Sequence, residues 1–515
     1  MKSGELKNII SQIRKYNLEK VFETPEDLDK WLKGLNNKQI NNFLSLKVEP
    51  NEIQFPLCYL IDDNLLNCDD YQERIKAMTK LKNAEGWYHL YDNLCSPNFL
   101  DSNNYYEDME MIAKAPSAQY PLWIIDKDVF INSPYHQQDL KLIVEAKDTE
   151  KEEYKKLDWL VAEALTIVAG SANSINSPYH QQDMELIAHA GSECLQISHS
   201  YPEYSLNNLA INEFSLKDKY HLENMQILAK NPIASIFLYE LMTNPETING
   251  QYYREEVKAL ASANSMIKAV AMYCYIANPD DFDLRRKSYD YQNALWDLGL
   301  DFNATKELKR RNSIKGNSNP KYLKYLELLN QIDDKKVLFV ESLLSNQIFA
   351  SSEYCDHDID LLLSIEDENL FTDIYRVMSN ETSLTGSHHI SDLDIISKTK
   401  TNEKRKWLIS KAIDDASINS DYHDYDMEYI KRLDLNSIDK ETLKEIHYYL
   451  FIGKGINHPN HVEILEKLSK GETIQSEELV LKYLDYLEKN PDVMEKSVEE
   501  KPKLFSRFFQ RYNKE

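Results

Sequence analysis

Two nearly identical stretches decide the fold of this 515-residue chain: INSPYHQQDLKLIVEA at residues 131–146 and INSPYHQQDMELIAHA at residues 175–190. Internal duplication accounts for such a match. In each copy, Ser and Pro precede Tyr-His, and apolar residues then recur three and four positions apart. Ser is a preferred N-cap, Pro fits the first helical position, and this apolar spacing forms a single stripe. Each copy therefore predicts the start of an amphipathic helix, with Ser133 or Ser177 as its cap.

Weaker copies of this motif occur along almost the whole chain. Each has an aromatic residue or His as its leader, followed by apolar positions three and four apart. The other leaders are Tyr71, Tyr105, Tyr220, Tyr252, Tyr289, Tyr322, Tyr354, His388, Tyr422 and the region near Asn457. From Tyr105 onward the leaders fall 30 to 44 residues apart, which is the size of one helical hairpin. Strand-based repeats would show a period of two, which these segments lack.

A second apolar stretch precedes many of the leaders, for example at residues 160–170, 235–245 and 266–279. These stretches predict the partner helix of each hairpin. A single hairpin cannot bury its own apolar stripe, so neighbouring hairpins must stack. We therefore expect an all-α chain of tandem helical hairpins stacked into an α-solenoid, or superhelix.

The expected architecture resembles the HEAT-like and TPR-like α-solenoids. The endings ILAKNP and YIANP, at Asn231-Pro232 and Asn278-Pro279, are similar to those of leucine-rich-variant helical repeats. The resemblance covers residues 60–470. It implies a fold but no particular activity, and the Trp, Leu-Gly and Tyr pattern typical of TPR repeats is absent.

The pattern divides the chain into five parts. Residues 1–60 predict an N-terminal helical cap, and residues 61–305 a first repeat array. Residues 306–324 are rich in Lys and Arg around GNSNP and predict a linker, with a docking site for an acidic partner as the alternative. Residues 325–490 predict a second array, and residues 491–515 an amphipathic capping helix. Because that last segment is basic and aromatic, a peripheral membrane or protein contact is its alternative role.

Composition narrows the class of protein. The net charge of −25 disfavours general nucleic-acid binding, since affinity for phosphate backbones depends on Lys and Arg. No stretch approaches the roughly 20 apolar residues that a membrane crossing needs, and no apolar signal-peptide core is present. The six cysteines lie far apart and predict buried, reduced thiols. We expect a cytoplasmic protein, and the wealth of Asn, Lys and Ile suggests a bacterial source.

The repeated Tyr-His-x-x-Asp motif invites two interpretations. His136 and Asp139, like His180 and Asp183, are three residues apart and share a helix face. Stacking then predicts a ladder of His residues along one edge of the array, which suggests metal binding or a response to pH. The favoured alternative is structural: Tyr packs between hairpins while His and Asp cap or bridge the helix ends.

Aromatic clusters give the candidate partner-binding residues. One lies in EGWYHLYDNL at residues 85–94 and another in SHSYPEYSLNN at residues 198–208, and each predicts either a peptide-binding groove or core packing. Together with the Tyr-His leaders, the candidates are Trp87, Tyr88, His89, Tyr91, Tyr135, His136, Tyr179, His180, His199, Tyr201, Tyr220 and His221.

No catalytic, cofactor or metal site can be assigned from motifs. The phosphate-binding glycine loops, HExxH, GxSxG and the EF-hand loop are all absent from the sequence. The preferred hypothesis is a scaffold or adaptor that binds a protein or peptide partner and needs no cofactor. Two alternatives are an enzyme whose site combines scattered His, Asp and Tyr residues between 85 and 221, and an acidic inhibitor or immunity-type protein that occupies a basic target.

Overall fold

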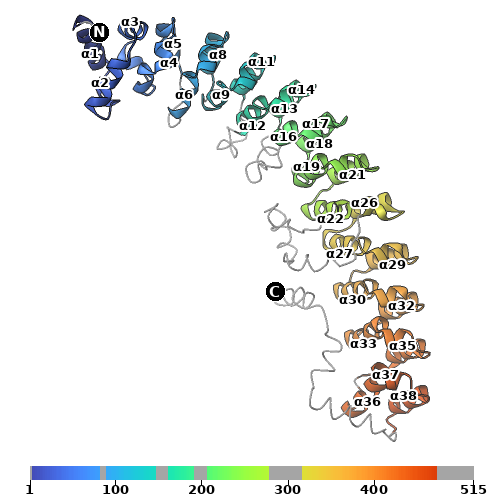
Figure 1. Ribbon diagram of the computed structural model, residues 1–515. Helices are drawn as coiled ribbons and strands as arrows, with labels where there is room; N and C mark the ends of the chain where they lie inside the picture. Colours follow the sequence, from blue (N-terminus) through green and yellow to red (C-terminus); the bar gives the residue numbers. More distant parts are fainter. Residues whose placement is uncertain are drawn as a thin grey trace. The chain divides into compact units, whose positions relative to one another are not determined.

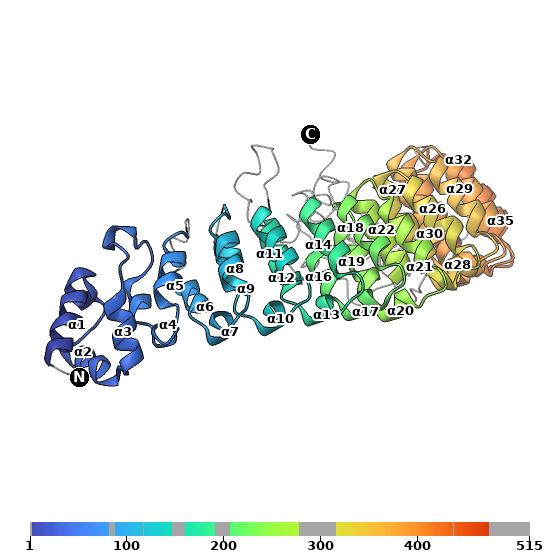
Figure 2. The same ribbon diagram turned by 90° about the horizontal axis from the view of Figure 1, so that it is seen from above.

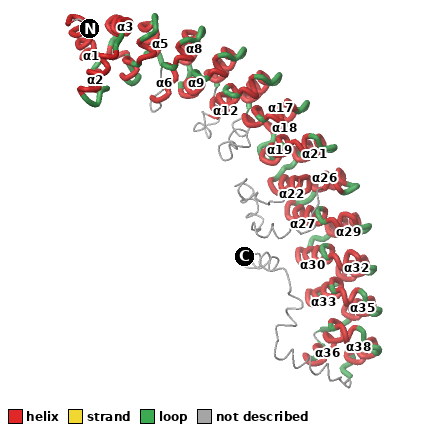
Figure 3. The backbone as a smooth tube through the Cα atoms, in the orientation of Figure 1, coloured by secondary structure: helices red, strands yellow, loops and turns green. Residues whose placement is uncertain are grey.

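The computed structural model describes residues 3–81, 88–116, 118–146, 160–190, 206–277, 316–435 and 437–472. These residues form helices, turns and loops but no strand, which confirms the predicted all-α class (Figure 3). The chain divides into two compact units, Met1–Tyr253 and Arg254–Glu515, and each is described by itself. None of the described helices is both long and apolar enough to cross a membrane.

Unit 1 opens with α1 (Ser3–Lys15), α2 (Pro25–Gly34) and α3 (Asn37–Ser45), together with the 3-10 turns η1 (Leu18–Lys20), η2 (Pro50–Glu52) and η3 (Leu57–Ile61). Three kinds of helix then follow one another in a fixed order. The short helices are α4 (Asp63–Leu66), α7 (Pro97–Leu100), α10 (Asp128–Ile131), α13 (Ala172–Ile175), α17 (Glu213–Lys217) and α20 (Pro245–Ile248). The rung helices, which begin at the motif, are α5 (Tyr71–Met78), α8 (Tyr105–Ile112), α11 (His136–Glu145), α14 (His180–His189) and α18 (His221–Lys230). The backing helices are α6 (Tyr91–Leu94) with η4 (Tyr88–Leu90), α9 (Gln119–Ile124), α12 (Leu160–Ala169), α16 (Leu206–Ile211) and α19 (Ser235–Thr243).

Unit 2 repeats the same order of helices. Rung helix α21 (Tyr253–Ala261) starts at the last residue of unit 1 and continues into unit 2. The other rung helices are α26 (Tyr322–Gln331), α29 (Cys355–Ser364), α32 (His389–Lys398), α35 (His423–Arg432) and α38 (His461–Ser469). The backing helices are α22 (Met266–Ala277), α27 (Asp334–Leu344), α30 (Glu368–Met378), α33 (Asn402–Ile413) and α36 (Lys440–Phe451). The short elements are η7 (Gly316–Ser318), α28 (Gln347–Ser351), α31 (Glu381–Thr385), α34 (Asp415–Ile418) and α37 (Gly453–Ile456).

The motif marks the start of a helix, but the helix begins later than Ser and Pro predict. Helix α14 starts at His180, and Tyr179 is its N-cap residue. The Ser177 hydroxyl instead accepts a hydrogen bond from the N–H of Tyr179 at 3.1 Å, in a turn that precedes the helix. Ser133 makes the same contact with Tyr135. Ser therefore fixes the turn that aims His into the interior, because short polar side chains bond their own backbone two residues on.

The short helix before each rung helix is a feature that the two-helix prediction missed. These helices are about one turn long, so apolar periodicity cannot reveal them. Their caps are nevertheless visible in the sequence: the side chain of Asn212 accepts from the N–H groups of Phe214 and Ser215, and Asp414 accepts from Ser417. Figure 2 shows α10, α13 and α17 along one edge of unit 1.

Neighbouring helices pack in chain order within each unit. In unit 1, α11 contacts both α8 and α14, and α12 contacts both α9 and α16. Figure 1 shows the rung helices α8 and α11 on one side and the backing helices α9 and α12 on the other. Leu140 on α11, Leu165 on α12 and Met184 on α14 are fully buried. The predicted partner helices at 160–170, 235–245 and 266–279 are confirmed as α12, α19 and α22.

Several predictions fall partly or wholly outside the described residues. These are the leader Tyr289, the basic residues 306–315, and the segment 491–515. The remaining part of the predicted linker contains η7 and the start of α26, where Lys321 and Lys324 form ion pairs with Asp356. The prediction that the cysteines are buried is wrong for Cys58, which is exposed, and Cys68 is half-buried. Cys95, Cys274 and Cys355 are buried as predicted.

Candidate functional site

A buried His–Asp contact joins the motif at residues 175–190 to the rung helix before it. The Nε2 atom of His180 donates to Oδ2 of Asp139 at 2.9 Å, although the two residues are 41 positions apart. Both side chains have no exposed surface. Since a buried carboxylate is stable only when it is paired and hydrogen-bonded, this contact fixes the relative position of α11 and α14. We call each such contact a rung.

Six rungs of this kind join His to Asp in the described residues, and their Nε2–Oδ distances lie between 2.6 and 3.0 Å. They are His136–Asp108, His180–Asp139 and His221–Asp183 in unit 1, and His389–Asp358, His423–Asp392 and His461–Asp426 in unit 2. The favoured structural interpretation of the motif thus matches the geometry. His and Asp bridge neighbouring helices.

Other residue pairs occupy the same positions where the motif is degenerate. Tyr253 accepts from Asn224 at 2.6 Å, and Tyr322 donates to Glu256 at 2.8 Å. Farther along the chain, the Tyr325 hydroxyl lies 3.2 Å from the Cys355 sulfur. Near the N-terminus, the Arg74 guanidinium lies 4.0 Å from the centre of the Tyr105 ring, a cation–π contact. Neighbouring rung helices therefore make a contact at the same two motif positions even where the residues are not His and Asp.

The leader aromatic residue packs on the His of the next rung. The rings of Tyr135 and His180 have centroids 4.9 Å apart, and those of Tyr179 and His221 are also 4.9 Å apart. In unit 2, the ring of Tyr354 lies 5.2 Å from that of His389. Each leader is half-buried, because one ring face covers the His while the other edge reaches the surface.

The Gln that follows His binds the second carboxylate oxygen. Gln137 donates to Oδ1 of Asp108 at 2.6 Å, and Gln181 donates to Oδ1 of Asp139 at 3.0 Å. The His221–Asp183 rung differs, because the residue that follows His221 is Leu222 and not Gln. Oδ1 of Asp183 is consequently buried without a hydrogen-bond partner. Burial raises the pKa of Asp183, and its bond to His221 offsets part of that shift.

Unit 2 contains a buried Lys that shares an Asp with a rung. The Lys411 ammonium has no exposed surface and donates to Oδ2 of Asp426 and to the carbonyl of Leu450, both at 2.7 Å. Asp426 accepts from His461 through its other oxygen. Burial lowers the pKa of Lys411, and the neighbouring Asp426 carboxylate opposes that shift.

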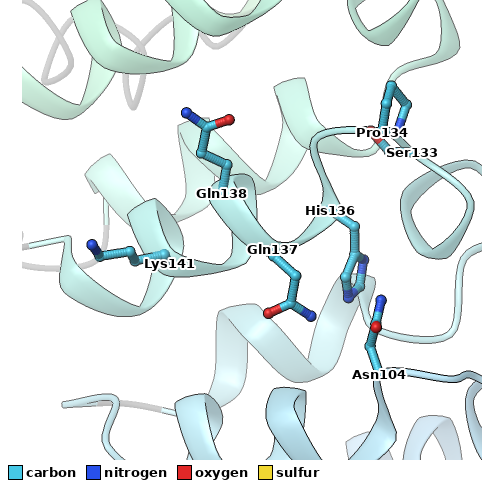
Figure 4. A pocket seen from close by; sticks show the side chains of 7 residues that line it. All are labelled: Asn104, Ser133, Pro134, His136, Gln137, Gln138 and Lys141. Atoms are coloured by element: carbon cyan, nitrogen blue, oxygen red, sulfur yellow. The ribbon is translucent and has the colours of Figure 1, made fainter.

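An open hollow of roughly 460 Å³ lies beside the first His–Asp rung (Figure 4). Its lining comes from the turns and first residues of two rung helices: Asn104, Ser133, Pro134, His136, Gln137, Gln138 and Lys141. The Gln137 side chain is already bonded to Asp108, and His136 is nearly fully buried. The hollow is therefore open and shallow, and its lining brings together no convergent set of reactive groups.

The structure places the predicted site residues in three different environments. His136, His180 and His221 are buried in rungs, while Tyr135, Tyr179 and Tyr220 are half-buried beside them. Tyr91 is 2% exposed and packs against Phe55 and Tyr59, whereas His89 is exposed. The candidates that lie outside the described side chains are Trp87, Tyr88, His199 and Tyr201.

Two exposed apolar residues were not singled out from the sequence. Trp123 on α9 is 43% exposed, and Ile167 on the neighbouring α12 is 39% exposed. Each lies twelve residues before the Tyr of its motif, at Tyr135 and Tyr179, so the two positions are equivalent. Aligning the backing helices on the motif would have shown this correspondence, although exposure itself is not visible in a sequence.

The described residues include no group of three His, Cys, Asp or Glu side chains suited to hold a metal ion. Comparisons of the chain with protein-family models, with curated proteins and with solved structures give no match.

Proposed function

We propose that this chain is a helical-repeat scaffold of the α-solenoid type that binds a basic segment of a partner protein. The observation that carries the proposal is the recurrence of one interhelical contact. In unit 1, three rungs at equivalent positions join α8, α11, α14 and α18 in succession. A chain built in this way presents equivalent surface positions on successive backing helices, which is how solenoid proteins form extended binding surfaces.

The exposed pair Trp123 and Ile167 is the proposed contact surface for this partner. Large apolar side chains at the centre of an interface supply most of its binding energy, and Trp is enriched among such residues. The net charge of −25 favours a cationic partner, and an Arg or Lys side chain can also stack on the Trp ring. The thiols of Cys58, Cys68, Cys95 and Cys355 are compatible with a cytoplasmic location, where thiols stay reduced.

The test compares two double variants of the full chain by affinity purification and mass spectrometry. Trp123→Ala with Ile167→Ala removes the proposed surface. Val129→Ala with Phe214→Ala removes apolar side chains of similar exposure, 40% and 45%, from the short helices α10 and α17. We expect a partner to be lost only with the first variant. Circular dichroism and thermal unfolding check that both variants fold.

Direct binding then decides the proposal. The purified partner should bind the wild-type chain at least roughly tenfold more tightly than the Trp123→Ala and Ile167→Ala variant, which corresponds to about 1.4 kcal/mol. Affinity should fall as salt is added, since exposed opposite charges are screened. Equal binding by both double variants, or binding that is indifferent to salt, contradicts the proposed surface and partner class.

A further inference from the structure

The backing-helix position that carries Trp123 and Ile167 in unit 1 carries polar residues on two helices of unit 2. Trp123 and Ile167 each lie twelve residues before the leader of the following motif. Twelve residues before the leaders of α32 and α35 are Arg376 on α30 and Ser410 on α33. Helices α30 and α33 are neighbouring backing helices that contact each other (Figure 1). Arg376 and Ser410 therefore occupy equivalent positions on adjacent helices.

The Arg376 guanidinium is a half-buried cation with no partner among the described residues. None of them accepts a hydrogen bond from its N–H groups, and none of their carboxylates lies within ion-pair distance of it. Burial lowers the pKa of Arg376, and the charge of Asp373 opposes that shift. The guanidinium stays charged at neutral pH. A half-buried charge of this kind must find its acceptors in water or in a bound anion.

The carboxylate closest to Arg376 along α30 is already bound by another Arg. Asp373 lies three residues before Arg376, and so on the same face of α30. The Nε atom of Arg405 on α33 donates to Oδ2 of Asp373 at 2.8 Å. The rest of the Arg405 guanidinium donates to groups at the start of α33 and just before it. Arg376 therefore adds a positive charge beside an ion pair that is already neutral.

Lys406 and Ser410 on α33 supply two further donors. They are four positions apart and share a face of the helix. Lys406 is exposed and Ser410 is half-buried, and neither side chain has a hydrogen-bond or ion-pair partner among the described residues. Burial raises the pKa of Asp373. The charges of Arg405, Arg376 and Lys406 oppose that shift, so all three cations lie near this one carboxylate and two positive charges stay uncompensated.

We propose that Arg376, Lys406 and Ser410 form a binding site for a phosphate monoester, which we call the α30–α33 patch. Such a group carries a charge of about −1.5 to −2 at neutral pH and has three acceptor oxygens. Its charge matches the two uncompensated cations, and the planar Arg fork can donate to two of its oxygens. A carboxylate has a single charge and would leave one cation unpaired. The inference does not depend on the partner proposed for Trp123 and Ile167, because it concerns other helices and a ligand of opposite charge.

The first test measures binding of phenyl phosphate to the full chain by saturation-transfer nuclear magnetic resonance. Benzoate and benzyl alcohol carry the same ring with a carboxylate or with no charge, and they are the comparison ligands. Wild type should bind phenyl phosphate more tightly than either, and Arg376→Gln should weaken that binding at least roughly tenfold. Arg432→Gln changes an exposed Arg of unit 2 that pairs with Glu466 and should leave the affinity unchanged. Equal affinity for the three ligands, or equal affinity of wild type and Arg376→Gln, overturns the proposal.

The second test uses Lys406→Gln and a phosphopeptide. Because Lys406 is exposed, this variant should fold even if circular dichroism shows that Arg376→Gln does not. It should also bind phenyl phosphate more weakly than wild type, and an unchanged affinity contradicts the patch. Displacement of phenyl phosphate by a short phosphoserine peptide, but not by its unphosphorylated form, supports a phosphate carried by a protein. Binding of phenyl phosphate without displacement by the phosphopeptide supports a small phosphorylated molecule as the ligand.

Discussion

His180 pairs with Asp139 on the preceding rung helix, and Asp183 on its own helix accepts from His221 on the following one. The motif residues His180 and Asp183 therefore point in opposite directions along the stack, although they are only three positions apart. Where the motif has both His and Asp, as in α14, the rung helix gives one donor to the helix before it and one acceptor to the helix after it. This head-to-tail arrangement explains why His and Asp recur together.

Removing one side of a rung should destabilise unit 1 strongly. Asp139→Ala leaves buried His180 and Gln181 without their shared acceptor. We expect the free energy of unfolding to fall by about 3 to 5 kcal/mol, because the remaining groups stay desolvated and unpaired. Urea unfolding followed by circular dichroism measures the loss. The exposed Glu185→Ala change on α14 is the control and should stay within about 0.5 kcal/mol of wild type. Equal effects of the two changes would show that the rung carries no stability.

A second hydrogen-bond partner for Asp183, in the His221–Asp183 rung, should stabilise unit 1. Leu222→Gln places an amide where Gln137 and Gln181 bind their carboxylates, within reach of the unpartnered Oδ1 of Asp183. A hydrogen bond to a buried charged group contributes about 1.5 to 3 kcal/mol, less the apolar contact that Leu222 loses. Leu222→Met keeps that apolar contact and is the control. If Leu222→Gln unfolds at the same urea concentration as Leu222→Met, the amide does not reach Asp183.

The sequence alone predicted the helices but not the partners of their polar residues. The leaders Tyr135 and Tyr179 marked the rung helices to within one residue, because apolar periodicity and turn residues act locally. The pairing of His180 with Asp139 depends instead on how α11 and α14 stack. The spacing of residues in the sequence does not predict that arrangement. Degenerate rungs such as Cys355 with Tyr325 lack any shared residue type, so only the contact reveals them.

The exposed surface was the least predictable part of the candidate site. Tyr91 and Trp123 are both aromatic residues in apolar stretches, yet Tyr91 is 2% exposed and Trp123 is 43% exposed. The difference arises from which side of a backing helix faces the next helix. Periodicity over a helix as short as α6 or α9 does not fix that side. The His and Asp residues of the rungs, in contrast, belong to a motif that recurs along the chain, so their positions are easier to predict than those of the exposed residues.

Residues 279–314 should be removable without loss of the neighbouring packing. Rung helices α21 and α26 are joined directly by the Tyr322–Glu256 hydrogen bond, although their first residues are 69 positions apart. Gly316 and Tyr275, which flank the segment, lie close together: a Cβ added to Gly316 would lie 2.7 Å from the Tyr275 ring. We expect a variant with a short Gly-Ser linker in place of residues 279–314 to keep its cooperative thermal unfolding. Tm lies within a few degrees of wild type if the prediction holds, because the variant keeps the Tyr322–Glu256 hydrogen bond and the close approach of Gly316 to Tyr275.

A matched control for this deletion is Gly316→Ala in the full chain. The added methyl group meets the ring and the carbonyl of Tyr275 at 2.7 Å, so it should lower Tm although only one atom is added. Early, non-cooperative unfolding of the deletion variant would contradict the prediction and show that residues 279–314 hold α22 and α26 together.

Lys411 should make the stability of unit 2 depend on alkaline pH, because it is buried. Burial lowers its pKa in the folded state below the value of an exposed Lys, about 10.4. Between the lowered pKa and that value, the unfolded chain binds more protons than the folded chain, so this Lys adds stability as the pH rises.

Lys411→Met removes that contribution together with the bonds to Asp426 and Leu450. The difference in the free energy of unfolding between wild type and variant should therefore widen from about pH 7 to about pH 9. Lys398→Met, which changes an exposed Lys paired with Asp394, should show no such widening. A constant difference for Lys411→Met would mean that Lys411 keeps its charge in the folded protein over this whole range.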